Sequence, residues 1–191
     1  YTTNVIFGET ESEMSILAAQ TEECQHNAPV TPLTPVYPDD KPPVDPLSGA
    51  ILIFAPGATA TPGSEEARSL SGLSDTLKAI FTADDDMKNI YIATDSGMML
   101  MYPGDANLSK TYDPRMRTWY VQAVARGKQV WSDVPYVDAG HHELVMTCSQ
   151  AVPSQKYGHW VIGADVSTKT ISEDFIGQPL GGKGYAVLLN Q

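Results

Sequence analysis

The stretch Tyr112-Asp113-Pro114-Arg115-Met116-Arg117-Thr118-Trp119-Tyr120 combines two guanidinium groups, one indole and two phenols within nine consecutive residues. A guanidinium is a rigid fork of N–H donors that matches a carboxylate, and the indole N–H is a donor without an acceptor function. The faces of phenol rings attract cations. Few hydrophobic cores need this mixture, so the stretch indicates a binding site for a small molecule.

Acidic residues further along the chain complement these cationic groups. Asp138 follows Tyr136 by two residues, and Asp165 follows the apolar pair Val161-Ile162 in a strand-like segment. A carboxylate beside such a segment is costly without a counter-charge, which favours either a ligand or a buried partner for Asp165. An α-amino acid needs a fork for its carboxylate and acceptors for its ammonium, and these residues supply both.

Each of these residues also has a structural interpretation. Arg117 contacts either a ligand or a neighbouring carboxylate in the folded loop. We expect Arg115 to point elsewhere and to stabilise the fold as a partner of Asp113 or a similar group. Asp138 either contacts the ligand or caps a turn at residues 139–140, and Trp119 is either a ligand contact or a core residue.

The order and spacing of these residues resemble the double-Cache (dCache) family of extracytoplasmic sensor domains. That family's signature reads Asp-Pro-Arg-x-Arg-Pro-Trp-Tyr and is followed by a Trp-x-Asp-x-x-Tyr element. This chain is similar at residues 113–120, with Thr118 in place of Pro, and at Trp131, Asp133 and Tyr136. Both Thr and Pro suit the start of a helix. The resemblance covers roughly residues 64–191.

The resemblance also implies a role for each residue, because amino-acid-binding members of the family are similar at these positions. Arg117 and Trp119 would hold the ligand carboxylate. The ammonium would be held by Tyr120, Asp138 and Asp165. The walls would be completed by Tyr112 and Tyr136.

By resemblance, the chain is an extracytoplasmic, periplasmic or extracellular, ligand-binding domain of a membrane-anchored receptor of the chemoreceptor or sensor histidine kinase type. Its ligand would be an amino acid or a similar small amine or carboxylate, and we expect membrane segments only in flanking sequence. Two alternatives remain open at this point. One is a ligand-free module that dimerises through its first helix, and the other is a sensor for a simple carboxylate.

Composition excludes several other classes of function. Twelve basic residues against 23 acidic ones give a net charge of −11, which argues against a nucleic-acid or anionic-membrane partner. No run of about 20 apolar residues marks a membrane span. The chain lacks a nucleophile elbow, a phosphate-binding glycine loop and paired metal ligands, so we expect neither catalysis nor a cofactor.

The pattern of elements predicts an α+β fold, with a long N-terminal helix packed on a PAS-like (Cache) antiparallel sheet. Four regions follow along the chain. They are a scaffold helix at 1–26, a proline-rich excursion at 27–63, a membrane-distal PAS-like module at 64–176 that binds the ligand, and at 177–191 a C-terminal strand or the start of a membrane-proximal module.

Local signals place the elements within these regions. The helix near the N-terminus has a heptad seam, and Ser64 is the expected N-cap of a second helix that Ser71-Gly72 interrupts. The expected strands cover 90–94, 98–102, 134–138, 143–152 and 159–166, with possible pairing of residues 52–54. Helices are expected at 118–125 and 167–176, and a further strand at 185–189.

Several other residues invite an interpretation. Cys24 and Cys148 either form a disulfide or remain two free thiols. His141-His142 and residues 84–86 could suggest metal sites, but neither has suitable spacing, and solvated turns are expected at both.

Overall fold

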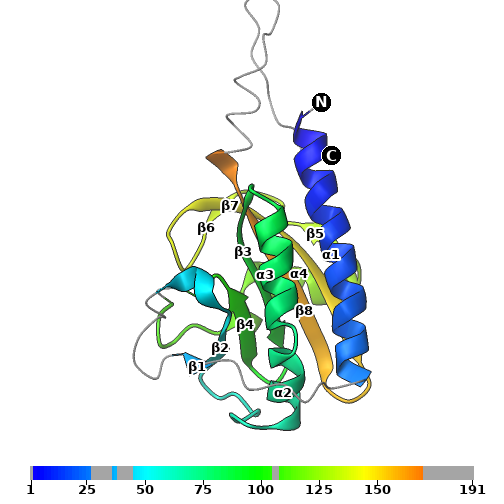
Figure 1. The fold of residues 1–191 in the computed structure, drawn as a ribbon, viewed down its shortest axis with the longest axis vertical. Coiled ribbons are helices and arrows are strands. Elements are labelled where there is room, and N and C mark those ends of the chain that lie inside the picture. Colours follow the sequence, from blue (N-terminus) through cyan, green and yellow to red (C-terminus); the bar gives the residue numbers. More distant parts are fainter. Residues whose placement is uncertain (1, 27–35, 38–44, 105–107, 170–191) are drawn as a thin grey trace, which may run out of the picture.

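The computed structural model describes residues 2–26, 36–37, 45–104 and 108–169, and it has the α+β architecture that the sequence predicts (Figure 1). The strands form one sheet in the order β1-β2-β4-β3-β8-β7-β5, and β6 also pairs with β7. Every pairing is antiparallel except that of β1 with β2. The strands are β1 (Val36–Tyr37), β2 (Ile51–Phe54), β3 (Met87–Thr94), β4 (Met98–Tyr102), β5 (Val130–Trp131), β6 (Tyr136–Val137), β7 (Leu144–Ser154) and β8 (Gly158–Ser167).

Helices cover both faces of this sheet, and Figure 1 shows three of them side by side on one face. These are α1 (Thr2–His26), α2 (Glu65–Ser71) and α3 (Ser74–Ala83), whereas α4 (Thr118–Arg126) packs on the opposite face. Short 3-10 turns lie at η1 (Pro46–Ser48) and η2 (Pro114–Met116).

Strand alternation divides the core between the two faces, because successive side chains of a strand point in opposite directions. On β3, Ile90 and Ile92 pack against α1–α3, whereas Tyr91 and Ala93 pack against α4. The same division holds on β4 and β8. The sheet therefore separates a helix-packed core from the face that carries the polar residues singled out by the sequence.

The predicted seam of α1 is confirmed. Thr10, Met14, Leu17, Thr21 and Cys24 are all buried against the sheet and α2. At the start of the seam, the Phe7 ring packs edge-on against Trp131, with ring centroids 4.5 Å apart, and the Trp131 indole N–H donates to Glu11 at 2.9 Å. The signature tryptophan of the second motif thus fastens α1 to β5.

The predicted boundaries of the other helices also have local causes. Ser64 accepts a hydrogen bond from the amide of Ala67 and caps α2, and the helix breaks at Gly72 as expected. Thr118 is the first residue of α4 and does not cap it, which is the position that proline favours in other chains. Gly127 ends α4 in a left-handed conformation with φ of 60°.

Two predictions concerning turns and cysteines have clear outcomes. The prediction of a solvated turn is wrong for Asp84, because this residue is buried and accepts hydrogen bonds from Thr10 and from the amide of Asp86. Cys24 and Cys148 are buried free thiols. In the described part of the chain, no group of three His, Cys, Asp or Glu is placed to hold a metal ion, and no helix has the length and apolar content of a membrane span.

Several predictions lie outside the described residues. These are most of the helix expected at 167–176, the strand at 185–189, the division at residue 177 and much of the proline-rich excursion. Within that excursion, the apolar group at 52–54 is part of β2, which pairs with β4.

Glu13 on α1 faces Asp84 across the boundary between α1 and the end of α3. Burial, followed by repulsion from Asp84, raises the pKa of Glu13 from its usual 4.5 to about 7, and its Oε2 atom has no hydrogen-bond partner among the described residues. The folded chain therefore binds a proton at Glu13 more tightly than the unfolded chain does. The stability that this proton contributes is full below pH 4.5 and is lost as the pH rises through 7.

We expect Glu13→Gln to remove this loss, because a neutral amide keeps the protonated form's shape at every pH. At pH 8 the melting temperature should rise by roughly 2–4 °C relative to the wild type, the shift that about 1 kcal/mol produces in a domain of this size. At pH 5 the two proteins should melt together. Glu22→Gln, at an exposed position of the same helix, is the control, and an equal effect of the two substitutions would refute the assignment.

Candidate functional site

A small chamber lies on the α4 face of the sheet, and its volume is about 30 Å³. Its floor consists of side chains from β3, β4 and β8, and its walls come from the signature stretch, the start of α4 and the loop after β6. The described residues that line it are Asn89, Tyr91, Met99, Met101, Leu108, Tyr112, Arg117, Trp119, Tyr136, Asp138, Ala139, Gly140 and Asp165.

The floor is acidic because Asp165 stands in the middle of the sheet, with only 4% of the residue exposed. Its Oδ1 accepts hydrogen bonds from the hydroxyls of Thr147 at 2.5 Å and Tyr91 at 2.8 Å. The Tyr136 hydroxyl lies 2.5 Å from Thr147 Oγ1, so it extends the network to the wall. Thr147 is the direct cross-strand neighbour of Asp165, which fixes this geometry through the register of β7 and β8.

Burial raises the pKa of Asp165 from its usual 3.8 to about 6, although the hydrogen bonds from Thr147 and Tyr91 act in the opposite direction. Burial also raises the pKa of the phenols of Tyr91, Tyr112 and Tyr136, so all three are neutral at pH 7. At neutral pH the chamber therefore holds a carboxylate that accepts from two hydroxyl donors, and no cation of the described residues belongs to its hydrogen-bond network.

Asp138 has the turn-capping role considered for it, and its contact with a ligand stays a prediction. Its carboxylate accepts hydrogen bonds from the amides of Gly140, His141 and Glu143 at 2.7–2.8 Å, and so it holds the turn after β6. The residue is buried and also lines the chamber. A second acid thus lies at the acidic end, and its repulsion adds to the raised pKa of Asp165.

Arg117 provides the opposite pole at the start of α4. Its guanidinium lies over the Tyr112 ring at 5.6 Å, and within the described ranges no carboxylate is close enough to form an ion pair with it. The positive end of the α4 dipole adds to the field there. Trp119 is buried beside it, with its ring 4.8 Å from that of Tyr91, and its carbonyl accepts from the Ser149 hydroxyl.

Arg115 behaves as the sequence predicts. Its guanidinium forms a two-pronged contact with the Asp113 carboxylate, at 2.9 Å from Nε and 2.7 Å from an Nη atom. Further bonds reach the carbonyls of Pro56 and Asp95, so this arginine ties the signature stretch to the β3–β4 turn. The two arginines of the stretch therefore differ: Arg115 stabilises the fold through Asp113, whereas Arg117 lines the chamber.

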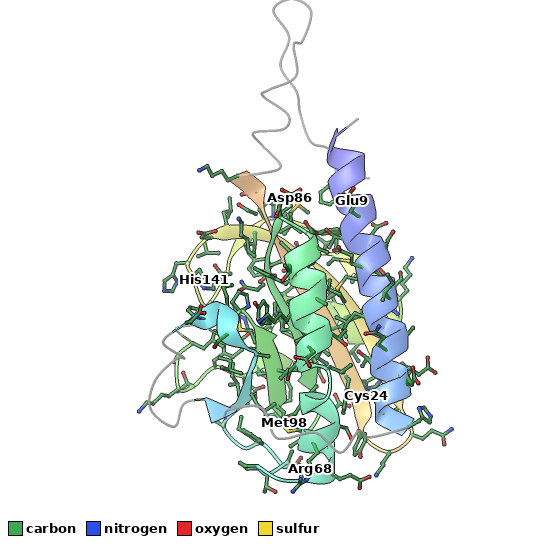
Figure 2. The ribbon with its side chains drawn as sticks, in the orientation of Figure 1. Glu9, Cys24, Arg68, Asp86, Met98 and His141 are labelled. Atoms are coloured by element: carbon green, nitrogen blue, oxygen red, sulfur yellow. The ribbon has the colours of Figure 1, made fainter. Side chains whose placement is uncertain are left out.

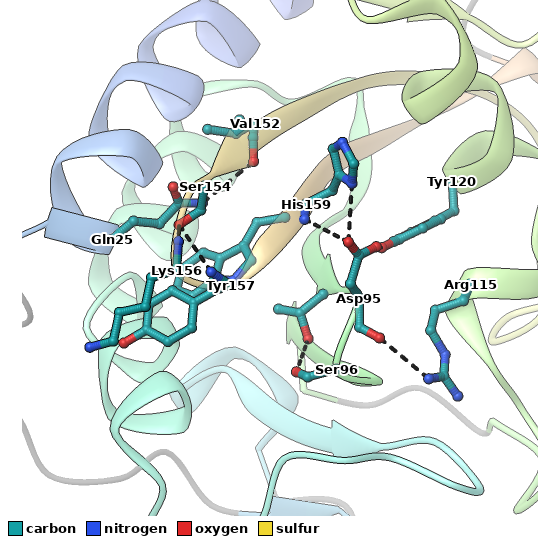
Figure 3. Close-up of polar contacts among 12 residues, drawn as sticks. Gln25, Asp95, Ser96, Arg115, Tyr120, Val152, Ser154, Lys156, Tyr157 and His159 are labelled. Atoms are coloured by element: carbon teal, nitrogen blue, oxygen red, sulfur yellow. Dashed lines mark hydrogen bonds and ion pairs between the residues drawn. The ribbon is translucent and has the colours of Figure 1, made fainter.

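Tyr120 differs from the prediction, since it does not line the chamber. Its hydroxyl donates to Asp95 Oδ1 at 2.5 Å, while the amide and ring nitrogen of His159 lie 2.7 and 3.0 Å from Asp95 Oδ2 (Figure 3). One turn residue thus joins α4 to the start of β8. Burial alone would raise the pKa of Asp95, but the hydrogen bonds from Tyr120 and His159 lower it.

The Tyr91 ring lies over β8, toward Asp165 and Trp119, because its cross-strand neighbour on β8 is Gly163. A Cβ atom on Gly163 would lie only 2.3 Å from Cε2 of the Tyr91 ring. Glycine is needed here for close approach and not for an unusual backbone conformation. The position of the Tyr91 hydroxyl that donates to Asp165 therefore depends on the absence of a side chain at Gly163 on the neighbouring strand.

Asn89 is the cross-strand neighbour of Asp165 on β3, and it lines two cavities. Besides the chamber, it borders a second cavity of about 110 Å³, which also shares Asp138. The other lining residues of this second cavity are Lys88, Pro103, His141, Glu143 and Val145. His141 marks its place on the side of the fold away from α1 (Figure 2).

Six of the seven predicted site residues thus line one chamber, and only Tyr120 lies outside it. Sequence reasoning missed Asn89 and Tyr91, along with the apolar lining residues Met99, Met101 and Leu108. Asn89 carried a usable signal, since it is a polar residue within the strand segment Met87–Thr94. His141 and His142, in contrast, lie exposed in the turn as expected.

Comparison with known proteins places this geometry in context. The family model described as "Methyl-accepting chemotaxis protein-like, first PDC sensor domain" matches residues 65–173. Methyl-accepting chemotaxis protein TlpB of Bacillus subtilis is 32% identical over 117 residues, which are 61% of this chain and 17% of that protein. PctB of Pseudomonas aeruginosa is 33% identical over 85 residues, which are 44% of this chain and 13% of that protein.

A solved structure of the ligand-binding domain of PctB, an amino acid chemoreceptor of Pseudomonas aeruginosa PAO1, in complex with L-Arg also resembles this fold. The TM-score is 0.50 at 27% sequence identity, with 58% of this chain and 48% of that domain covered. The chain therefore spans less than a fifth of the two full-length relatives and about half of the solved domain.

We expect Gly163→Ala to destabilise the fold by about 1–3 kcal/mol, the usual cost of overpacking, since the new methyl group meets the Tyr91 ring. Urea denaturation measures the change, with Gly49→Ala as the control because nothing lies near that position. In a Tyr91→Ala background the same substitution should cost much less. An unchanged cost in that background would rule out the ring as the cause.

Proposed function

The chain belongs to the family of methyl-accepting chemotaxis protein-like first PDC sensor domains, and we propose that it binds an amino acid for a membrane receptor. The observation that carries this proposal is the pair of opposed poles in one chamber. Arg117 lines the chamber without a carboxylate partner among the described residues, and Asp165 lines the same chamber with no cation among its described hydrogen-bond partners. The PctB domain, which was solved with L-Arg and with L-Gln, shares this fold.

The proposed orientation of the ligand follows from charge. The ligand carboxylate binds the Arg117 guanidinium near the Trp119 indole, because a guanidinium fork matches two carboxylate oxygens. The ligand ammonium binds at the floor, where Oδ2 of Asp165 has only a long contact of 3.5 Å from Asn89 among the described residues and Asp138 adds negative charge. The ligand side chain extends past Asn89 into the second cavity, which is the larger of the two.

Binding must widen the chamber. One water needs roughly 10–15 Å³ of such volume, so a cavity of about 30 Å³ is too small for an amino acid. The sheet floor is held by long strand pairings, whereas the walls at 112–117 and 136–140 consist of turns, one 3-10 turn and the two-residue strand β6, and we propose that these walls move. A ligand that prefers one arrangement of the walls shifts the population toward it, which is the elementary event of a sensor.

The remaining features of the proposal concern the whole receptor. We place the domain outside the cytoplasm, with membrane segments in flanking sequence and a signalling output beyond them. The half-exposed Ile16 on α1 supports a homodimer through that helix. We propose that the site serves binding, because its acids are paired with hydroxyls and backbone amides.

The central contact is tested by Arg117→Ala. Loss of a charge-assisted hydrogen bond costs about 1.5–3 kcal/mol, so we expect the Kd for the bound amino acid to rise roughly 10- to 100-fold. A thermal-shift screen of the twenty amino acids and of small amines and carboxylates identifies the ligand, and calorimetry then measures the Kd. Arg126→Ala, at an exposed residue of α4, should leave the affinity unchanged.

The same screen separates the competing functions. Stabilisation by amine-free carboxylates equal to that by amino acids would replace the proposal with a simple carboxylate sensor, in which Asp165→Asn binds as well as the wild type or better. No response to any compound would favour a ligand-free structural module. Wild-type affinity in Arg117→Ala would remove the proposed carboxylate contact.

Affinity for the amino acid should fall at acidic pH. Asp165 has a pKa of about 6 in the free chain, so it is charged at pH 7 and neutral at pH 5. A neutral carboxyl offers no counter-charge to the ammonium, and we expect the Kd to rise about tenfold for each pH unit below 6. Calorimetry between pH 5 and 8 measures this slope. In Asp165→Asn the affinity should be weak and its dependence on pH much flatter, and a wild-type slope in that variant would contradict the assignment.

A further inference from the structure

We infer that Asn89 is an additional ligand-binding residue, which accepts a hydrogen bond from the ammonium and makes the site selective for primary amines over N-methylated ones. This inference rests on the proposed function and deepens it. Asn89 belongs to neither of the two sequence motifs that identify the site. It is recognised only because the structure brings it beside Asp165 at the floor of the chamber.

The first argument is the state of its amide oxygen. Asn89 is 2% exposed, and its Oδ1 is a buried atom without a hydrogen-bond partner among the described residues. A buried acceptor without a donor costs about 1–3 kcal/mol, and native proteins have few such atoms. The side chain lines the chamber, so a donor on a bound ligand can satisfy this oxygen.

The second argument is how the sheet delivers this side chain. The pairing of β3 with β8 shifts by one residue between Met87 and Asn89, which is a β-bulge. Met87, before the bulge, packs on the α1–α3 face, whereas Asn89, after it, alternates regularly with Tyr91 and Ala93 and so points to the chamber face. Beyond the bulge, Asn89, Asp165 and Thr147 lie opposite one another on three adjacent strands. Three polar side chains thus form a row across the floor.

The third argument is a count of acceptors in that row. Asp165 Oδ1 already accepts from Thr147 and Tyr91, whereas Oδ2 receives only a long contact of 3.5 Å from Asn89 Nδ2. The acceptors left for a ligand at the floor are therefore Asp165 Oδ2 and Asn89 Oδ1. A primary ammonium carries three N–H donors and serves both oxygens while a third N–H faces the Asp138 side.

Other ligand headgroups fit this arrangement less well. An N-methyl group replaces one donor by a methyl that must lie among buried polar atoms, which leaves an acceptor without a partner. A carboxylate without an amine brings no donor to Asn89 Oδ1. A site built to hydrogen-bond a group discriminates strongly against analogues that lack it, because its own polar atoms are then left unpaired.

The test uses three probes with one carbon skeleton: L-alanine, N-methyl-L-alanine and propionate. The methyl side chain of alanine makes the least demand on the second cavity. We expect the wild type to bind L-alanine at least about tenfold more tightly than N-methyl-L-alanine, the ratio that one lost hydrogen bond of about 1.4 kcal/mol gives. Calorimetry, or competition against the amino acid found by screening, measures the three affinities.

Asn89→Leu removes the acceptor at nearly constant volume. We expect it to weaken L-alanine binding about tenfold or more, to leave propionate binding unchanged and to abolish the preference over N-methyl-L-alanine. Asn89→Asp keeps an acceptor oxygen and should restore part of the L-alanine affinity. Thr94→Val, an isosteric loss of a buried hydroxyl on the same strand outside the chamber, is the control and should bind all three probes as the wild type does.

The outcomes separate this inference from the function beneath it. Wild-type affinity for L-alanine in Asn89→Leu, with discrimination against the N-methyl compound retained, would overturn the inference and leave the amino acid proposal intact. Equal binding of propionate and L-alanine by the wild type would overturn both. If Asn89→Leu does not fold, failure of Asn89→Asp to prefer L-alanine over its N-methyl derivative is the result that overturns it.

Discussion

A carboxylate buried in the middle of a β-sheet constrains everything around it. Asp165 cannot rotate toward solvent, because its backbone is paired on both sides by β3 and β7. Its charge is therefore tolerable only through donors that come to it, and the fold supplies Thr147 from one strand and Tyr91 from another. These hydroxyls saturate one oxygen and leave the other facing the chamber. The site is polar at its floor for this reason.

The same strands connect the site to the rest of the molecule. On one face of these strands, Asp165 of β8 lies in the chamber floor and Thr147 of β7 donates to it, while side chains on the other face of both strands pack under α1. Trp131 joins α1 to β5, which pairs with β7, and Asp95 joins α4 to the turn before β4. A change in the chamber that altered the spacing of β7 and β8 would reach α1 through a single layer of sheet. This proximity is a physical route for a signal.

The charged residues of the site could be predicted from the sequence because charged and aromatic residues at fixed spacing are uncommon outside binding sites. Arg117, Asp138 and Asp165 could be singled out in this way, and the heptad seam of α1 and the strand alternation were sufficient for the fold class. The assignment of Arg115 to Asp113 followed from its position in a non-helical loop. Each of these inferences depended on local patterns.

The features that sequence did not reveal depend on register and packing. Asn89 lies on the chamber face by alternation with Tyr91, but its place opposite Asp165 depends on the register of β3 with β8, and no pattern in one strand predicts its partner's register. Tyr91 reaches Asp165 because the facing residue is glycine, a relation between strands 72 positions apart in sequence. Tyr120 turned to Asp95 because the first turn of α4 directs adjacent residues to different sides. Asp84, which resembled a solvated turn, was buried by α1.

The central claim is that Asp165 is a buried acid whose charge is completed by the ammonium of a ligand. Carbon-13 NMR of the Asp165 carboxyl, assigned with Asp165→Asn, measures this charge directly. In the free domain the carboxyl should titrate with a midpoint near pH 6, and saturation with the bound amino acid should move that midpoint downward. A midpoint that does not change when the ligand saturates the site would contradict the account.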